Sequence, residues 1–206
     1  MKKTLVFMIL SVGLGVLGWW LLSREPIWRV TGGQTVEDMT TYQEYAGTQP
    51  GLMVRFEYPQ AWPLHEEQGK REFYRAIRIA GPRNPNDTYT TYLSVRASPL
   101  KSFGGKYERL ADAITQYVDH LLEGSRIIAQ QQATVADSTG TDVLVTYTMP
   151  ALHHKGLKAE AVPVTARTVF FEKAPYLYEV TYSADSREYE QHAQAFEHLL
   201  TTFRFQ

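Results

Sequence analysis

The sequence predicts an antiparallel β-sheet covered by two amphipathic helices and preceded by one N-terminal transmembrane helix. The sheet is indicated most strongly at Val164–Phe171 and Tyr176–Tyr182, which are rich in β-branched and aromatic residues and are separated by a short turn. A helix is predicted next, because apolar residues recur at helical spacing as far as Phe203, with Asp185 or Ser186 as its N-cap. A hairpin backed by one helix cannot bury both faces of a sheet, so more strands and a second helix must complete the domain.

The N-terminal segment, residues 1–23, has the pattern of a membrane anchor. Lys2 and Lys3 precede an uncharged run from Thr4 to Leu22, which as a helix would span roughly 28 Å, close to the roughly 30 Å hydrocarbon core of a bilayer. The lysines favour a cytoplasmic N-terminus, which predicts a single-pass protein of the cell membrane with its C-terminal domain on the extracytoplasmic, periplasmic side. The alternative is a signal peptide that is cleaved near Val16–Gly18.

Residues 24–50 are predicted to form a tether between this anchor and an extracytoplasmic domain at residues 51–206. Turn signals at Gly32–Gly33 and Gln49–Gly51 interrupt the tether. Between them, Thr35–Asp38 has the pattern that starts a short helix.

Three strands are predicted to open the domain, because apolar and polar residues alternate along Leu52–Tyr58, Phe73–Ala80 and Tyr89–Ala97. Their polar alternate face favours antiparallel pairing, since parallel strands are usually apolar on both faces. The connections Trp62–Lys70 and Gly81–Thr88 are predicted to be polar surface loops.

A second helix is predicted after Gly104–Gly105, with Gly124 as its C-terminal stop. Its apolar positions are Tyr107, Leu110, Ala111, Ile114, Tyr117, Val118, Leu121 and Leu122. A weaker strand, Ile127–Val135, contains three consecutive glutamines, and a strong strand, Asp142–Met149, follows it. The loop Pro150–Pro163 leads to the hairpin described first. The predicted order is three strands, a helix, four strands, a helix and a candidate terminal strand.

Two motifs resemble those of the PsbP/Mog1-like superfamily. Phe56–Trp62 is similar to its aromatic–x–Tyr–Pro–x–x–Trp entry strand, and Tyr178–Ser183, followed by a helix and Phe203–Phe205, is similar to its closing segment. The resemblance covers about Gly51–Gln206 and implies an antiparallel sheet between helices, an α/β/α sandwich. Bacterial members commonly carry a lipidated cysteine, so in this cysteine-free chain the transmembrane anchor would replace it. The superfamily includes the lumenal PsbP subunit of photosystem II and Ran-binding Mog1, and it has no shared catalytic residues.

Composition argues against several kinds of chemistry. The net charge of −1, without a long run of either sign, gives no indication of a nucleic-acid partner. The absence of cysteine excludes thiolate nucleophiles and cysteine-ligated zinc. No Gly-x-Ser-x-Gly motif is present, and Gly104–Lys106 lacks the rest of a phosphate-binding loop. We therefore expect no enzyme activity, no cofactor and no metal, and we interpret His153–His154 as solvated loop histidines.

The function expected from the sequence is that of a non-enzymatic protein-interaction or complex-assembly module for a membrane-associated protein partner. The candidate partner-binding residues lie in or beside the predicted loops, where side chains have no role in the core. They are Trp62, His65, Arg83, His153, His154 and Lys155. The alternative is an extracytoplasmic carrier or sensor of a small ligand or metal, using a cleft near Trp62 and the His153 loop.

Overall fold

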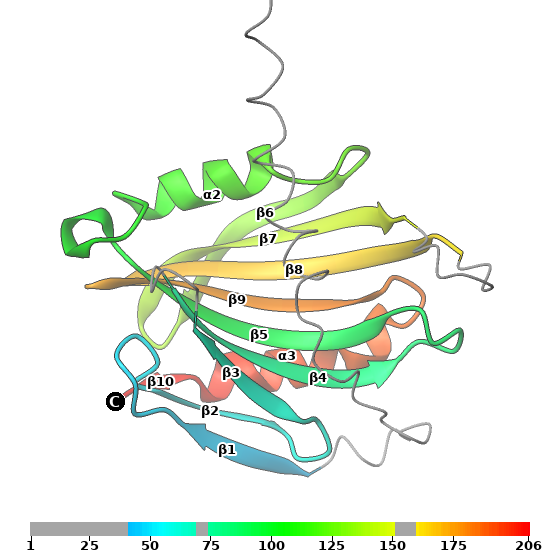
Figure 1. The fold of residues 1–206 in the computed structure, drawn as a ribbon, viewed down its shortest axis with the longest axis horizontal. Helices are drawn as coiled ribbons and strands as arrows, with labels where there is room; N and C mark the ends of the chain where they lie inside the picture. The colour runs from blue at the N-terminus through cyan, green and yellow to red at the C-terminus, as the bar shows by residue number, and fades with distance from the viewer. Residues whose placement is uncertain (1–40, 69–73, 151–159) are drawn as a thin grey trace, which may run out of the picture. The chain divides into compact units, whose positions relative to one another are not determined.

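The computed structural model describes residues 41–68, 74–150 and 160–206 (Figure 1). The strands are β1 (Tyr42–Ala46), β2 (Val54–Pro59), β3 (Leu64–Gln68), β4 (Arg75–Arg83), β5 (Thr90–Pro99), β6 (Arg126–Val135), β7 (Ser138–Met149), β8 (Val162–Lys173), β9 (Tyr176–Asp185) and β10 (Arg204–Phe205). The helices are the 3-10 turn η2 (Lys101–Phe103), α2 (Leu110–Asp119) and α3 (Tyr189–Thr202).

The strands form two antiparallel sheets. The larger sheet has seven strands in the order β3-β4-β5-β9-β8-β7-β6, and the smaller has three in the order β1-β2-β10. Every pairing between these strands is antiparallel, which confirms the predicted strand direction. The smaller sheet is not predicted by the sequence pattern.

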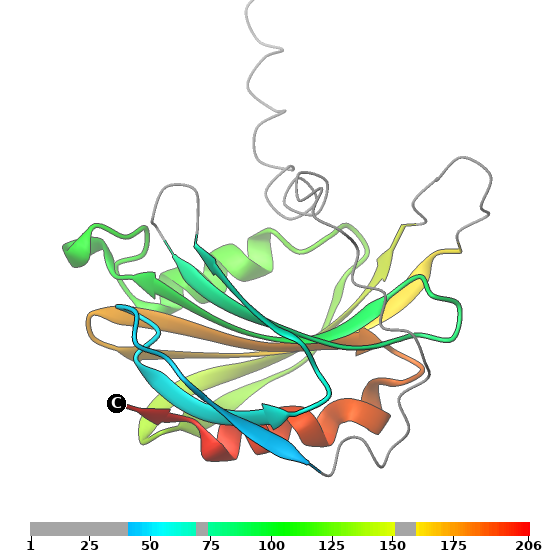
Figure 2. The same cartoon turned by 60° about the horizontal axis from the view of Figure 1, so that its bottom comes forward.

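The two helices lie on opposite sides of the larger sheet (Figure 2). Alternation along β8 shows this directly, because successive side chains point to opposite faces. Phe170 packs in a cluster with Ile114 and Tyr117 of α2, whereas Phe171 belongs to the cluster that contains Phe196 of α3. The smaller sheet lies on the same side of the larger sheet as α3.

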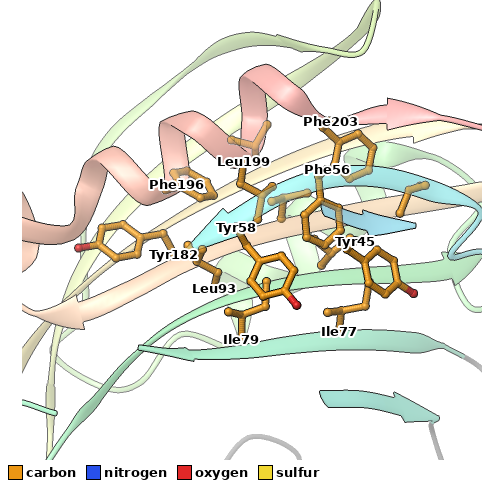
Figure 3. Packing of buried hydrophobic residues seen from close by; sticks show 14 of the residues in the cluster. Tyr45, Phe56, Tyr58, Ile77, Ile79, Leu93, Tyr182, Phe196, Leu199 and Phe203 are labelled. Atoms are coloured by element: carbon orange, nitrogen blue, oxygen red, sulfur yellow. The ribbon is translucent and has the colours of Figure 1, made fainter. Parts of the chain in front are cut away.

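The main core lies between the larger sheet, α3 and the smaller sheet (Figure 3). Its centre is aromatic: the ring centroids of Phe56 and Phe203 are 6.0 Å apart, and those of Tyr182 and Phe196 are 5.8 Å apart. Aliphatic residues of β4 and β5, among them Ile77, complete it. These residues occupy the inward positions of the predicted alternation.

Two strands correct the prediction. β1 lies inside the stretch predicted as a tether and pairs along its length with β2, so the folded domain begins before residue 51. β3 lies inside the predicted loop Trp62–Lys70 and pairs with β4 from Leu64 to Gln68. The predicted helix start at Thr35–Asp38 lies outside the described residues.

The N-terminus of α3 also differs from the prediction. Asp185 is the last residue of β9 rather than a helix cap, and the residue that precedes α3, Glu188, makes no capping hydrogen bond through its side chain. The buried carboxylate of Asp185 instead accepts hydrogen bonds from Asn84 Nδ2 at 2.8 Å and from Arg187 Nε at 2.9 Å. It therefore joins the loop after β4 to the end of β9.

Within the described ranges, no helix is long and apolar enough to cross a membrane. The predicted anchor, Thr4–Leu22, lies outside them.

Candidate functional site

Trp62 is a core residue, which corrects its assignment as a partner contact. Its side chain is 1% exposed, and its ring meets that of His192 edge to face at a centroid distance of 6.1 Å. Gly81 lies against the ring, because a Cβ atom there would stand 2.8 Å from a ring carbon. Since the ring is enclosed, Trp62 lines no open cleft of the kind the carrier alternative requires.

The other predicted contacts fall in separate places. His65 lies on β3 opposite Arg78 of β4. Arg83 ends β4, and its guanidinium is 2.6 Å from the carboxylate of exposed Asp87. His153, His154 and Lys155 lie outside the described residues and stay predictions. In the described part of the chain, no group of three or more histidine or acidic side chains could hold a metal ion.

On the α2 side of the sheet, Arg96 lies between a carboxylate and an aromatic ring. Its Nη1 is 3.8 Å from Glu179 Oε2, and its guanidinium carbon lies 4.1 Å from the centroid of the Tyr74 ring. Burial raises the pKa of Glu179, while the positive charges of Arg96 and Lys106 oppose that rise. Arg96 and Glu179 thus neutralise one another within the domain.

The edge strand β6 is the most unusual surface of the described chain. It pairs only with β7 among the described strands, and it ends the row of strands in the larger sheet (Figure 1). Every residue from Arg126 to Gln132 is exposed, so both faces of the strand meet solvent. Ile127 is 42% and Ile128 is 56% exposed. No charged residue and no proline interrupt Ile127–Val135.

The opposite edge strand, β3, shows how a natural sheet usually protects its edge. It is five residues long against ten for β6 and carries two carboxylates. One of these, Glu66, accepts a 2.8 Å hydrogen bond from Tyr45 Oη of the smaller sheet. Since β6 has none of these protective features, its exposed edge favours pairing with another strand.

The turn between β6 and β7 determines which backbone groups of β6 are available. Ala136 and Asp137 both have positive φ, 46° and 62°, as a two-residue type I′ turn requires. The flanking residues of such a turn form a hydrogen-bonded pair, and the pattern alternates along the strand. Val135, Ala133 and Gln131 therefore direct their backbone groups toward β7. The outward residues are Gln130, Gln132 and Thr134.

A hollow of about 430 Å³ borders β6 on the α2 side. It lies between Leu110 of α2, Gln130–Gln132 of β6 and Thr139–Thr141 of β7. A strand added beside β6 could place side chains next to this hollow.

The chain is similar to solved structures, but no family model and no curated protein sequence matches it. One is the solution structure of cyanobacterial PsbP from Synechocystis sp. PCC 6803, with 13% identity over 85% of this chain and 99% of that chain and a TM-score of 0.48. Another is LpqN of Mycobacterium tuberculosis, described as involved in cell envelope biogenesis, with 15% identity over 79% and 90% of the two chains and a TM-score of 0.49. A Pseudomonas aeruginosa protein of unknown function matches with 15% identity over 76% and 91% and a TM-score of 0.43.

The candidate site at β6 is not among the contacts predicted from the sequence. Two signals for it are present in Ile127–Val135: the run lacks charge, and its glutamines break the alternation that marks a half-buried strand. Both indicate a strand without a covered face.

Proposed function

We propose that this PsbP-like domain is a non-enzymatic protein-interaction module that binds an extended segment of a protein partner along β6. The observation that supports this proposal is the long, uncharged and exposed edge of the seven-stranded sheet. A strand added at such an edge obtains affinity from main-chain hydrogen bonds and selectivity from alternate side chains.

The chemistry of β6 defines the partner segment. Gln130, Gln132 and Thr134 each offer one N–H and one C=O group, and each hydrogen bond formed in water contributes about 0.5–1.5 kcal/mol. The exposed side chains of Ile127 and Ile128 add apolar contact at one end of the strand. A segment without proline and without strong charge fits this edge.

The expected test uses Gln132 as the probe, because its N–H points away from β7. Gln132→Pro removes the outward N–H, whereas Gln132→Ala keeps it and removes only the side chain. A photoreactive residue at Gln130, in full-length protein in its native membranes, should give a discrete crosslinked adduct. Gln132→Pro should reduce the adduct at least about tenfold, equivalent to about 1.4 kcal/mol, and Gln132→Ala should leave it nearly unchanged.

Folding must be checked in both variants, since proline on an edge strand is tolerated only where no ladder hydrogen bond is lost. Both should keep a single cooperative thermal transition. An adduct of unchanged yield in folded Gln132→Pro protein would contradict strand addition.

We also propose that Thr4–Leu22 holds the domain at the outer face of the cell membrane. Confinement to a surface raises the effective concentration of a membrane-bound partner, so a modest interface would suffice. A periplasmic reporter fused after Gln206 should be active, and the full-length protein should resist extraction from membranes by alkaline carbonate. Release of soluble protein that begins near Trp19 would contradict the anchor.

A further inference from the structure

We infer that the strand paired with β6 is β6 of a second copy of this chain, which gives a two-fold dimer with one continuous sheet. This inference rests on the proposed function, because it names the partner at the same edge. Three features of the molecule support it: the register that β6 allows, the lack of charge along its regular part and the protected opposite edge of the larger sheet.

The register follows from the bulge and the turn that limit β6. The pairing of β6 with β7 shifts between Ile127 and Ala129, so the regular part of the strand lies after the shift. The outward residues of that regular part are Gln130, Gln132 and Thr134. A two-fold axis at Gln132 places each of them opposite an outward residue of the other copy: Gln132 faces itself, and Gln130 faces Thr134. These pairs would exchange about six main-chain hydrogen bonds.

The side chains in this register are compatible with their own copies. Gln131 lies opposite Ala133, and the amide of Gln132 lies opposite an identical amide, which can both donate and accept. No like charges meet, because the only charged residue of β6, Arg126, lies beyond the bulge. Like charges directly opposite one another destabilise an antiparallel pair, and the regular part of β6 contains no charged residue.

The other edge of the sheet favours a closed pair over a fibre. Head-to-tail pairing would join β6 to β3, but β3 is short and its Glu66 is held by Tyr45 and by Gln49 Nε2 at 2.8 Å. Pairing of β6 with β6 uses the same surface on both copies and therefore closes after two chains. Among the described strands of the larger sheet, the resulting dimer leaves the protected β3 edges as its two ends.

The absence of cysteine permits a direct test on the purified full-length protein in detergent. Hydrogen-bonded antiparallel partners have Cα atoms about 5.5 Å apart, within the range of about 4.4–6.8 Å that a disulfide requires. Gln132→Cys should therefore form a disulfide-linked dimer rapidly under mild oxidation. Gln130→Cys alone should not, because its own copy lies four residues away along the strand, but Gln130→Cys combined with Thr134→Cys should. Gln191→Cys, on the exposed face of α3, is the matched control and should stay monomeric.

Sedimentation equilibrium tests the same inference without oxidation. The unmodified chain and Gln132→Ala should have the mass of a dimer, and Gln132→Pro that of a monomer. A monomeric mass for the unmodified chain, or equally slow crosslinking at Gln132 and Gln191, would overturn the dimer. If the membrane adduct then contained a different protein, strand addition at β6 would stand. If no adduct formed either, both proposals would fall.

Discussion

Replacing Phe196 by alanine should lower the free energy of unfolding by about 3–5 kcal/mol, the range for a large aromatic residue removed from a packed core. Phe196 is 1% exposed and joins α3 to the sheet, since its ring stacks on that of Tyr182 at 5.8 Å. The guanidinium carbon of Arg167 lies 5.3 Å from the centroid of the same ring. Urea unfolding followed by circular dichroism measures the loss.

Two further alanine variants control for this result. Leu121 is expected from the helical pattern to lie in the second helix, but it follows the end of α2 and is only partly buried. Leu121→Ala should therefore have a smaller effect, roughly 1–2 kcal/mol. Glu190 is exposed on α3, and Glu190→Ala should change stability by less than about 0.5 kcal/mol. Equal losses in all three variants would mean that the helix faces are misassigned.

Replacing Asp185 by asparagine should lower the free energy of unfolding at pH 7 by about 2 kcal/mol. The carboxylate is buried, and the hydrogen bonds from Arg187, followed by that from Asn84, lower its pKa to about 2. Asparagine keeps the shape of the side chain but removes the charge that Arg187 contacts. Because the carboxylate links the loop after β4 to the end of β9, the substitution weakens the connection between these two segments.

The effect of this substitution should depend on pH. The pKa of Asp185 is about 2 in the folded state and about 3.8 in the unfolded chain, so the unfolded chain takes up a proton first as the pH falls. The stabilisation is complete well above pH 4 and is lost as the pH falls from about 4 to about 2. As the pH falls through this interval, the free energy of unfolding should therefore decrease less in the Asp185→Asn variant than in the unmodified chain.

An exposed aspartate gives the matched control for this pH dependence. Asp87 forms an ion pair with Arg83, but its side chain is 71% exposed. Asp87→Asn should change stability by less than about 0.5 kcal/mol, because water screens such pairs. A pH profile of Asp185→Asn identical to that of the unmodified chain would contradict the assigned role.

The sequence predicts well those strands that have one buried face. β2 and β5 alternate between buried positions and more exposed ones, and their antiparallel direction is predicted from that pattern. The strands that are missed lack this signal. Only one of the five residues of β1 is buried, and β3 is an edge strand with a single aliphatic residue, Leu64. Both are strands because a neighbour pairs with them, which local propensity does not encode.

The candidate site was harder to predict than the fold. Trp62 precedes a proline in a turn, a context typical of a surface rim, yet the approach of Gly81 encloses its ring. Trp62 and Gly81 belong to different segments of the chain, and the local sequence of neither segment predicts their contact. For β6 the situation is reversed, because its lack of charge and of alternation is visible in the sequence. This composition indicates a binding edge only if the strand lies at the end of a sheet, and that position is known only from the strand order.

The short strand β10 has a consequence for the order in which the protein can fold during synthesis. β10 completes the smaller sheet by pairing with β2, and the side chain of Gln206 donates a 2.9 Å hydrogen bond to the carbonyl of Val54, 152 residues earlier. The helix that covers β2 also belongs to this late part of the chain, since Thr202 Oγ1 accepts a hydrogen bond from Glu57 N at 3.0 Å. On the ribosome, β1 and β2 therefore emerge long before α3 and β10, and a lone hairpin is only marginally stable. Contacts of such separation slow folding, and the smaller sheet can close only after β10 has emerged from the ribosome.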